Sequence, residues 1–461
     1  QKAVEKHNAK SGMAVFLDCH TGDLLAAAHF DPEETYRDRP VKLRPVTDQF
    51  EPGSVFKVIT AAALLDDGQI NFSDSTFCED GAWRIGRRTL HDDKDRGWLT
   101  FREIMELSSN IGIAKHAIEL GGEQLVEAAQ RFGVGQKQMS GLPGETSGRI
   151  ARPSRWSDYN VSALAMGHAV TVTSMQMASV FGAIANGGKL HRPRIVLGEV
   201  DDEGYVVNHR EPVVVGEALS KGAADSLRAF LRGVVERGTA DIINSKVIAL
   251  AGKTGTAQMP DPENKRYFQN RYIGSFGGFF PYENPAVAGI VVIEDPQPIH
   301  YGGHTAGPVF RNVAERYCVF RSDLLGDPAH MLLCDDDRRS PLIEVPNLMG
   351  RTLGSAREEV DKKNLKLRCG EGKGYVVWQF PAPDRLVLDG SEVMIAVADG
   401  ENVSPEMIDL TGLSIRQVSA FLEYCGISYE VRGNGRVVSQ SVGAGETILD
   451  GSLCRLRCRP I

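Results

Sequence analysis

The sequence lacks any long, uninterrupted apolar run and any dense cluster of basic residues. Its longest weakly polar segment, residues 161–188, is broken by polar side chains, a pattern typical of buried helices and not of a membrane span. The net charge of -8 gives no electrostatic reason to expect binding to nucleic acid or to an anionic lipid surface. We therefore expect a globular protein with no nucleic-acid partner.

The sequence also has no pattern typical of a metal site. None of its eight cysteines forms a CxxC pair, and no histidine lies at zinc-finger spacing. Residues 91–95 (HDDKD) contain metal-ligand types, but without a second cluster we interpret them as a solvated loop. Cys454 and Cys458 share one face of a predicted strand, where we favour buried free thiols over a disulfide with a distant partner. The sequence predicts neither a metal nor a cofactor.

A chain of 461 residues is too long for one compact core, so we expect two or three domains. We interpret residues 1–325 as one mixed α/β (α+β) unit with a largely helical middle. Turn residues separate its last three predicted strands, which indicates an antiparallel meander. The strands of this unit are predicted over residues 12–17, 24–29, 247–258, 271–280 and 286–294.

Beyond a charged linker at 326–342, the sequence contains an internal repeat. The tetrapeptide LDGS at 388–391 recurs at 449–452, and Gln379 recurs as Gln440 at the same offset. Such a repeat predicts two tandem modules of the same fold.

Each module is predicted to be a small α+β unit with a short strand, a helix and further strands. The helices are predicted over 355–364 and 415–424. We assign residues 343–400 to the first module and 404–461 to the second.

The strongest candidate for chemistry is the segment EPGSVFK at 51–57, which opens an apolar helix. Lys57 follows Ser54 by three residues, so both side chains lie on one helix face. A serine hydroxyl is a weak nucleophile and needs an adjacent base. A lysine buried at the positive end of a helix loses stability in its charged form, so its pKa should fall and its neutral amine could take the serine proton. Taken alone, the pattern more often describes a helix-capping serine followed by a lysine that extends into water.

Two further motifs strengthen the catalytic interpretation. Ser108, Ser109 and Asn110 interrupt two helical stretches, and residues 253–256 (KTGT) lie inside an apolar strand. In that strand Gly255 would let a ligand backbone approach closely. The order SxxK, SxN, KTG is a signature of penicillin-binding proteins and class A β-lactamases.

The sequence in fact resembles a known family. Residues 12–317 look like the transpeptidase domain of class B penicillin-binding proteins, the high-molecular-weight type of septal synthesis, and the repeats are similar to PASTA modules. The resemblance implies a transpeptidase/β-lactamase-like fold, an antiparallel sheet with a helical subdomain. Its supporting stretches are VTDQFEPGSVFK (46–57), LSSNI (107–111), GLPGETSGRIARPSRW (141–156), ANGGKLHRP (185–193) and GKTGTA (252–257).

The resemblance also implies catalytic roles for the first two motifs. Ser54 would attack the penultimate D-Ala carbonyl of a peptidoglycan stem peptide, with Lys57 as the base. Ser108 would relay a proton to the leaving amine, and Asn110 would hold the substrate amide. A neighbouring strand's amine would then resolve the acyl-enzyme, and β-lactam antibiotics would be trapped at the same serine.

The third motif is implied to bind the substrate. Lys253 would complete the electrostatics of the site, while Thr254 and Thr256, on either side of Gly255, would bind the terminal carboxylate. Backbone N–H groups of Ser54 and Thr256 would form the oxyanion hole.

The resemblance further implies a setting. Family members generally carry a membrane helix and a non-catalytic domain ahead of this unit. Because the chain starts at Gln1 with what looks like the end of a helix, we expect that a membrane anchor precedes it. The expected location is the cell membrane with the catalytic unit outside the cytoplasm, beside a division or elongation glycosyltransferase.

Two other functions remain open at this level. The same motifs serve a β-lactamase or a D,D-carboxypeptidase, which would need a base for deacylation; Glu145 is surrounded by proline and glycine and gains no support from a second feature. The tandem modules also allow a sensor of β-lactams or muropeptides. His300 and His304 flank two glycines and are either a cleft rim or an ordinary turn.

Overall fold

The chain divides into two compact units, Gln1–Arg316 and Tyr317–Ile461, and each is described by itself. The computed structural model describes residues 1–33, 42–68, 70–152, 155–197, 199–200, 206–207, 210–261, 263–264, 266–320, 342–370, 374–384, 386–388, 390–398, 407–446 and 452–459. Among these residues, none of the helices has the length and apolar character needed to cross a bilayer.

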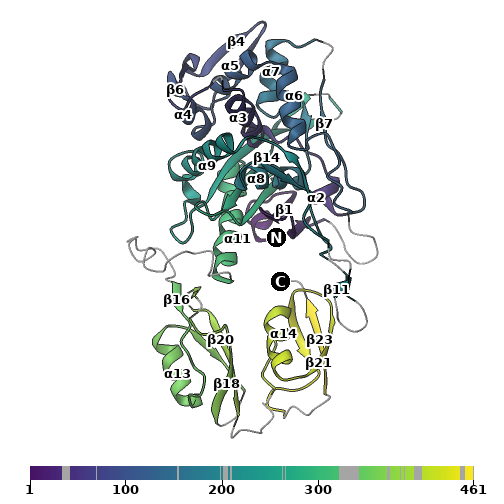
Figure 1. Ribbon diagram of the computed structural model, residues 1–461, viewed down its shortest axis with the longest axis vertical. Coiled ribbons are helices and arrows are strands. Elements are labelled where there is room, and N and C mark those ends of the chain that lie inside the picture. Colours follow the sequence, from purple (N-terminus) through teal and green to yellow (C-terminus); the bar gives the residue numbers. More distant parts are fainter. Residues whose placement is uncertain are drawn as a thin grey trace. The chain divides into compact units, whose positions relative to one another are not determined.

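The first unit is built on a five-stranded antiparallel sheet in the order β13-β14-β15-β1-β2 (Figure 1). The predicted opening strand pair and the predicted meander are both confirmed. The strands are β1 (Ser11–Asp18), β2 (Leu24–Phe30), β13 (Ala251–Asp261), β14 (Arg266–Phe280) and β15 (Val287–Glu294).

The start of β13 differs from the prediction, which placed it at residue 247. The hydroxyl of Ser245 accepts hydrogen bonds from the backbone N–H groups of Val247 and Ile248, at 3.1 and 3.4 Å. Arg232 donates to the carbonyl of Leu250 at 2.9 Å. These side-chain bonds keep residues 247–250 out of the strand, because they occupy backbone groups that a strand would pair.

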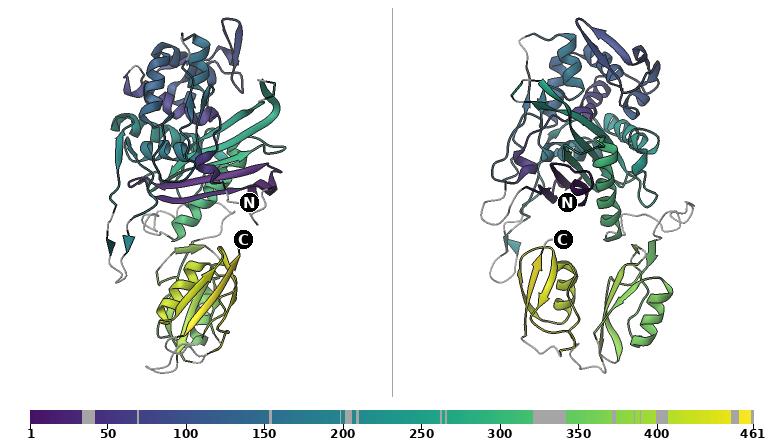
Figure 2. Two further views of the ribbon diagram at one scale, coloured as in Figure 1. Left: turned by 90° about the vertical axis from the view of Figure 1, so that its right-hand side faces the viewer. Right: turned by 180° about the vertical axis from the view of Figure 1, so that it is seen from behind.

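Helices cover both faces of the sheet. The helix α8 (Ser174–Ala185) is buried along its whole length and packs on β1, β14 and β15, with Phe181 against Gly277, where no side chain would fit. Phe310 of α11 (Gly307–Phe320) stacks edge-on against Phe276 and Phe280 on the opposite face, the one turned away from the helical lobe (Figure 2).

A helical lobe lies beyond α8 and surrounds α3, whose residues 57–64 are all buried. This lobe is the helical subdomain that was predicted to accompany an antiparallel sheet. Its helices are α3 (Lys57–Asp66), α4 (Phe101–Glu106), α5 (Asn110–Leu120), α6 (Gly122–Arg131), α7 (Asp158–Ala165) and α9 (Lys221–Glu236). Shorter elements of the unit are α1 (Lys2–Lys6), α2 (Arg44–Thr47), η1 (Gly53–Phe56), β3 (Ser75–Phe77), η2 (Glu79–Gly81), β4 (Ala82–Ile85), β5 (Arg88–His91), β6 (Trp98–Thr100), β7 (Arg149–Ile150), β8 (Val170–Thr171), β9 (Lys189–His191), β10 (Glu199–Val200), β11 (Val206–Val207), β12 (Val214–Glu217), η3 (Asp241–Ile243) and α10 (Gly302–Thr305).

The second unit contains the two predicted modules. Each has one helix and a three-stranded sheet in which the middle strand pairs parallel on one side and antiparallel on the other. The elements are β16 (Leu342–Glu344), α13 (Leu353–Lys362), β17 (Lys366–Arg368), β18 (Tyr375–Phe380), β19 (Leu386–Leu388), β20 (Glu392–Ala398), α14 (Ile415–Tyr424), β21 (Ser428–Arg432), β22 (Arg436–Gln440) and β23 (Leu453–Arg459). The predicted linker at 326–342 lies outside the described residues, apart from Leu342.

The repeated glutamine, Gln379 or Gln440, makes equivalent hydrogen bonds in the two modules. The side-chain oxygen of Gln379 accepts from the N–H of Leu348 at 2.8 Å, and that of Gln440 accepts from Leu410 at 2.6 Å. Each amide nitrogen also donates to two nearby carbonyls. The repeated glutamine thus supplies the hydrogen-bond partners of backbone groups in the first loop of each module. On β23, Cys454 and Cys458 are buried free thiols.

Candidate active site

Ser54 lies in a tight turn between two packed surfaces. Gly53 has a positive φ of 55°, and its N–H donates to the carbonyl of Gly167 at 3.2 Å. The next residues, Val55 and Phe56, are completely buried, whereas Ser54 keeps part of its surface exposed. The η1 turn therefore fixes the backbone on both sides of Ser54, while Ser54 itself stays partly exposed.

The turn runs directly into α3, where Lys57 is fully buried. Its Nζ donates to the backbone carbonyl of Ser108 at 2.7 Å and to the side-chain oxygen of Asn110 at 2.7 Å, and it lies 3.2 Å from Ser108 Oγ. One amine thus joins the SxxK motif to the SxN motif across two helices.

The SxN turn, residues 108–110, has a strained backbone and is held by hydrogen bonds to a residue that follows β5. Ser108 has a φ of 59°, which a non-glycine residue rarely adopts and which occurs most often at functional sites. Asp92, just after β5, accepts from the backbone N–H groups of Asn110 and Ile111 and from the hydroxyl of Ser109. Its carboxylate therefore caps the N-terminus of α5 from outside the helix.

Our interpretation of residues 91–95 as a solvated loop is wrong for Asp92. The Asn110 amide also donates to the carbonyl of His91 at 2.8 Å, so this segment is part of the support of the site. No group of three potential metal ligands occurs in the described ranges. A local sequence pattern could not reveal the capping role, because Asp92 acts on a helix that begins 18 residues later.

The KTG motif lies on β13, which runs beside the Ser54 turn. A side chain at Gly255 would collide with Ser275 Oγ and would press on Val55 and on the carbonyl of Pro52. Only a glycine therefore lets the strand and the turn approach this closely. Lys253, two residues earlier, is fully buried and lies close enough to Lys57 for the two charges to interact.

The two threonines of this strand have partners that the sequence did not suggest. Thr254 Oγ1 and Thr239 Oγ1 are 2.6 Å apart, which adds a third hydroxyl to the pair expected to bind a carboxylate. Thr256 Oγ1 accepts from the N–H of Gly302 at 3.3 Å. Gly302 begins α10, so the segment flanked by His300 and His304 lies against the KTG strand.

Burial decides the protonation of both lysines. It lowers the pKa of Lys57 to about 7, although the negative charges of Asp92 and Asp93 pull the value upward. Burial also lowers the pKa of Lys253 well below its usual value, and the charge of Lys57 lowers it further. The predicted fall in the pKa of Lys57 is thus present, and a neutral amine is available near neutral pH.

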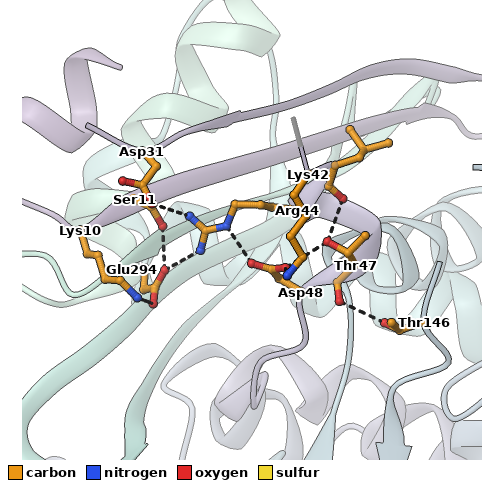
Figure 3. A network of polar contacts seen from close by, with 10 residues as sticks. Lys10, Ser11, Asp31, Lys42, Arg44, Thr47, Asp48, Thr146 and Glu294 are labelled. Atoms are coloured by element: carbon orange, nitrogen blue, oxygen red, sulfur yellow. Dashed lines mark hydrogen bonds and ion pairs between the residues drawn. The ribbon is translucent and has the colours of Figure 1, made fainter. Parts of the chain in front are cut away.

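A polar network anchors the segment that leads to Ser54 (Figure 3). Arg44 of α2 bridges three carboxylates: Asp31 at 3.1 Å, Asp48 at 2.7 Å and Glu294 at 2.8 Å. These carboxylates come from beyond β2, from beyond α2 and from the end of β15. The network therefore ties α2, which precedes the nucleophile in the chain, to the end of the central strand β15 and to the residue that follows β2.

Glu145 has a structural role. It accepts hydrogen bonds from the N–H groups of Gln138 and Ser140 and from the hydroxyl of Ser140, all within its own loop. Those bonds close a turn in which the carboxylate is fully engaged.

Known proteins resemble both units. Residues 12–315 match the family described as the penicillin-binding protein transpeptidase domain, and residues 343–399 and 405–453 match the PASTA domain. Penicillin-binding protein PbpB of Mycolicibacterium smegmatis is 32% identical over 331 residues, covering 68% of this chain and 51% of the relative. Stage V sporulation protein D of Bacillus subtilis is 28% identical over 413 residues, covering 86% and 62%. The chain thus spans about half the length of the PbpB relatives that it matches.

Solved structures agree with this assignment. Penicillin-binding protein 3 of Mycobacterium tuberculosis, complexed with aztreonam, superposes with a TM-score of 0.65 at 31% identity, covering 71% of this chain and 77% of that one. The same protein has been solved with ampicillin. The fold, the order of the three motifs and the two C-terminal modules lead to one conclusion: the chain belongs to the penicillin-binding protein transpeptidase family, with the class B character that the sequence predicted, and carries two PASTA domains.

Proposed function

We propose that this protein is a serine acyl-transferase that cross-links peptidoglycan stem peptides through an acyl-enzyme at Ser54. One observation carries the proposal: the buried amine of Lys57 joins Ser108 and Asn110 while Gly255 of the KTG strand packs on the Ser54 turn. Three motifs from distant parts of the chain thereby meet beside the turn that carries Ser54.

Acylation follows from the protonation states. Neutral Lys57 takes the proton of Ser54, and the alkoxide attacks the penultimate D-Ala carbonyl. Backbone N–H groups of Ser54 and Thr256 stabilise the developing oxyanion, an effect of about 3 kcal/mol per donor in other enzymes. Ser108, within 3.2 Å of the lysine amine, passes the proton on to the departing D-Ala amine.

Substrate binding uses the KTG strand. The hydroxyls of Thr254 and Thr256 bind the terminal carboxylate of the stem peptide, and Thr239 adds a third hydroxyl beside Thr254. The Asn110 side chain, held by Lys57 and the His91 carbonyl, has the fixed orientation needed to bind a substrate amide. Lys253 contributes its positive potential when protonated.

The proposal extends to the setting of the enzyme. Its substrates lie outside the cytoplasmic membrane, so we place the catalytic unit on the external face, anchored through a segment ahead of residue 1. A glycosyltransferase that polymerises the glycan strands is the expected partner.

Penicillin labelling tests the proposal. A fluorescent penicillin should form a stable ester with Ser54, located by mass spectrometry of the tryptic peptide, and Ser54→Ala should abolish the label. An unlabelled protein, or a label that persists in Ser54→Ala, contradicts the mechanism. Rapid turnover with release of hydrolysed drug would instead indicate a β-lactamase or a D,D-carboxypeptidase.

A further inference from the structure

A second polar cluster lies beside the Ser54 turn and has no part in the steps described so far. Glu51 Oε2 accepts from His168 Nδ1 at 3.2 Å and from the Tyr267 hydroxyl at 2.8 Å. The histidine and tyrosine rings meet edge to face, with centroids 5.9 Å apart. Three segments thus meet at Glu51, which precedes Ser54 by three residues. They are the Ser54 turn, the connection from α7 to β8, and the outer part of β14.

The position of His168 is fixed by close backbone packing. Gly167, with a φ of 82°, accepts the N–H of Gly53, and a side chain at Gly167 would collide with the Gly53 backbone. On the other side, Ala169 has a φ of 59°, a strained value for alanine. The histidine is therefore held between two left-handed residues directly against the Ser54 turn.

The hydrogen bonds define what His168 can do. With its proton on Nδ1, facing Glu51, the ring presents Nε2 as a base, and Nε2 has no protein partner among the described residues. The Glu51 side chain is only 15% exposed and stabilises the imidazolium that would form, while the histidine side chain is 35% exposed and can meet a ligand. Burial and the bond to Glu51 raise the pKa of Tyr267, so the phenol remains a donor and fixes the carboxylate.

We propose that the Glu51–His168 pair is the base that deprotonates the acceptor amine in the second half of the reaction. This inference rests on the function proposed above and assigns to it a residue distinct from Lys57. The acceptor of a cross-link is a primary amine, which is an ammonium in water and cannot attack until it loses a proton.

The step balances as follows in atoms and charge. The ammonium gives one proton to His168 Nε2, and the freed lone pair forms the N–C bond to the acyl carbon. The bond from that carbon to Ser54 Oγ then breaks, and the second amine proton passes through Lys57 and Ser108 to the serine oxygen. The partly exposed imidazolium finally releases its proton to water.

The test separates acylation from transfer. Wild-type protein and His168→Gln are acylated with a thioester analogue of a D-Ala-terminated peptide, and transfer is measured to a D-amino acid and to hydroxylamine. Glutamine can still donate to Glu51 but cannot accept the proton. Hydroxylamine is uncharged at neutral pH and needs no such base.

We expect His168→Gln to acylate normally with fluorescent penicillin and to transfer to hydroxylamine at the wild-type rate. Transfer to the ammonium acceptor should fall about 100-fold, the usual contribution of a general base. Glu51→Gln should also lower the rate of transfer to the ammonium acceptor. His20→Gln, an exposed histidine in the β1–β2 turn, is the matched control and should change none of the three rates.

Two results would overturn the inference while the proposed function stands: unchanged transfer to the ammonium acceptor, or an equal loss with both acceptors, which would make His168 a positioning residue. Absence of penicillin labelling in the wild-type protein would overturn both.

Discussion

The surroundings of Lys57 have two opposite effects on the charge of its amine. Its side chain is completely buried, which disfavours charge, yet it makes contacts to two oxygens of the SxN turn that favour a donor. The balance leaves its pKa at about 7, where small changes in the surroundings alter the fraction of neutral amine.

The rate of Ser54 acylation should therefore rise with pH and reach half its maximum near pH 7, because the neutral amine is the base in the proposed mechanism. Lys57→Arg should lower the rate at least about 100-fold at every pH, since a guanidinium does not deprotonate. Stopped-flow measurement with a fluorescent penicillin provides the profile. A flat profile between about pH 5.5 and 8.5 would contradict the assignment of the base.

Asp92→Asn should shift that profile to lower pH. The carboxylate raises the pKa of Lys57, so its removal lets burial lower the pKa further. The variant also loses the acceptor for the Ser109 hydroxyl, at a cost of about 1 kcal/mol in the free energy of unfolding.

Asp93→Asn is the matched control for this variant. Asp93 also raises the pKa of Lys57, but it forms an ion pair with Arg96 and its side chain is 55% exposed. We expect a smaller shift of the profile in the same direction and an unchanged free energy of unfolding. Equal loss of stability in both variants would show that the cap on α5 is unimportant.

At the scale of secondary structure, the segment before the nucleophile depends on Arg44. Its side chain is 12% exposed and holds Glu294 and Asp48, which are nearly as buried. Burial opposes ionisation of Glu294, but hydrogen bonds from Lys10, Ser11 and Arg44 outweigh it and keep its pKa below the usual value.

Arg44→Ala should lower the free energy of unfolding by about 3 kcal/mol at neutral pH, because three partly buried carboxylates lose the guanidinium that bridges them. A carboxyl group with a depressed folded-state pKa stabilises above its unfolded pKa, and this stabilisation is lost as pH falls through the folded value. The difference from wild type should therefore shrink below about pH 4. Lys221→Ala, which removes an exposed pair with Asp225, should cost less than about 0.5 kcal/mol in the same urea titration. An equal decrease in the free energy of unfolding in Arg44→Ala and Lys221→Ala would contradict a stabilising role for the Arg44 network.

Sequence patterns predicted the elements of this protein better than the contacts between them. The strands β1, β2, β14 and β15 follow from apolar runs bounded by turn residues. The three predicted motifs lie together in the structure, beside the Ser54 turn. The late start of β13 was missed because Ser245 competes for backbone groups from outside the strand. Asp92, Thr239 and the Glu51–His168 pair were missed for a similar reason: each acts on a partner that only the fold brings near.

At the scale of the whole molecule, each unit has an apolar core of its own. The core of the first unit is formed by residues between 13 and 292, and the modules contain two further clusters. Deletion of residues 343–461 should therefore leave the rate of Ser54 acylation within about 2-fold of the full chain. Loss of labelling in a truncated protein that retains its circular dichroism spectrum would show that the modules support catalysis.

The two modules of the second unit share one of those clusters. Met394 and Ala396, on β20 of the first module, pack with the core of the second module. The ring of Trp378 in the first module stacks on that of Tyr424 in the second. Arg368 donates to the carbonyls of Asp409 and Thr411, at 2.9 and 2.8 Å.

The modules should consequently unfold together. Trp378 is the only tryptophan beyond residue 316, so its emission in the isolated segment 317–461 reports the interface between them. We expect one urea transition, separated into two by Arg368→Ala, whereas Arg357→Ala, on the exposed face of α13, should retain one. Two transitions in the unmodified segment would contradict a shared core.

The packing of Gly255 against the Ser54 turn has a consequence for selection by antibiotics. Every other residue at this position would push the KTG strand away from the Ser54 turn. Under the proposed function, a bacterium exposed to β-lactams could therefore not gain resistance there without impairing the proposed acyl transfer. A saturation library at position 255, grown with and without drug, should return glycine alone.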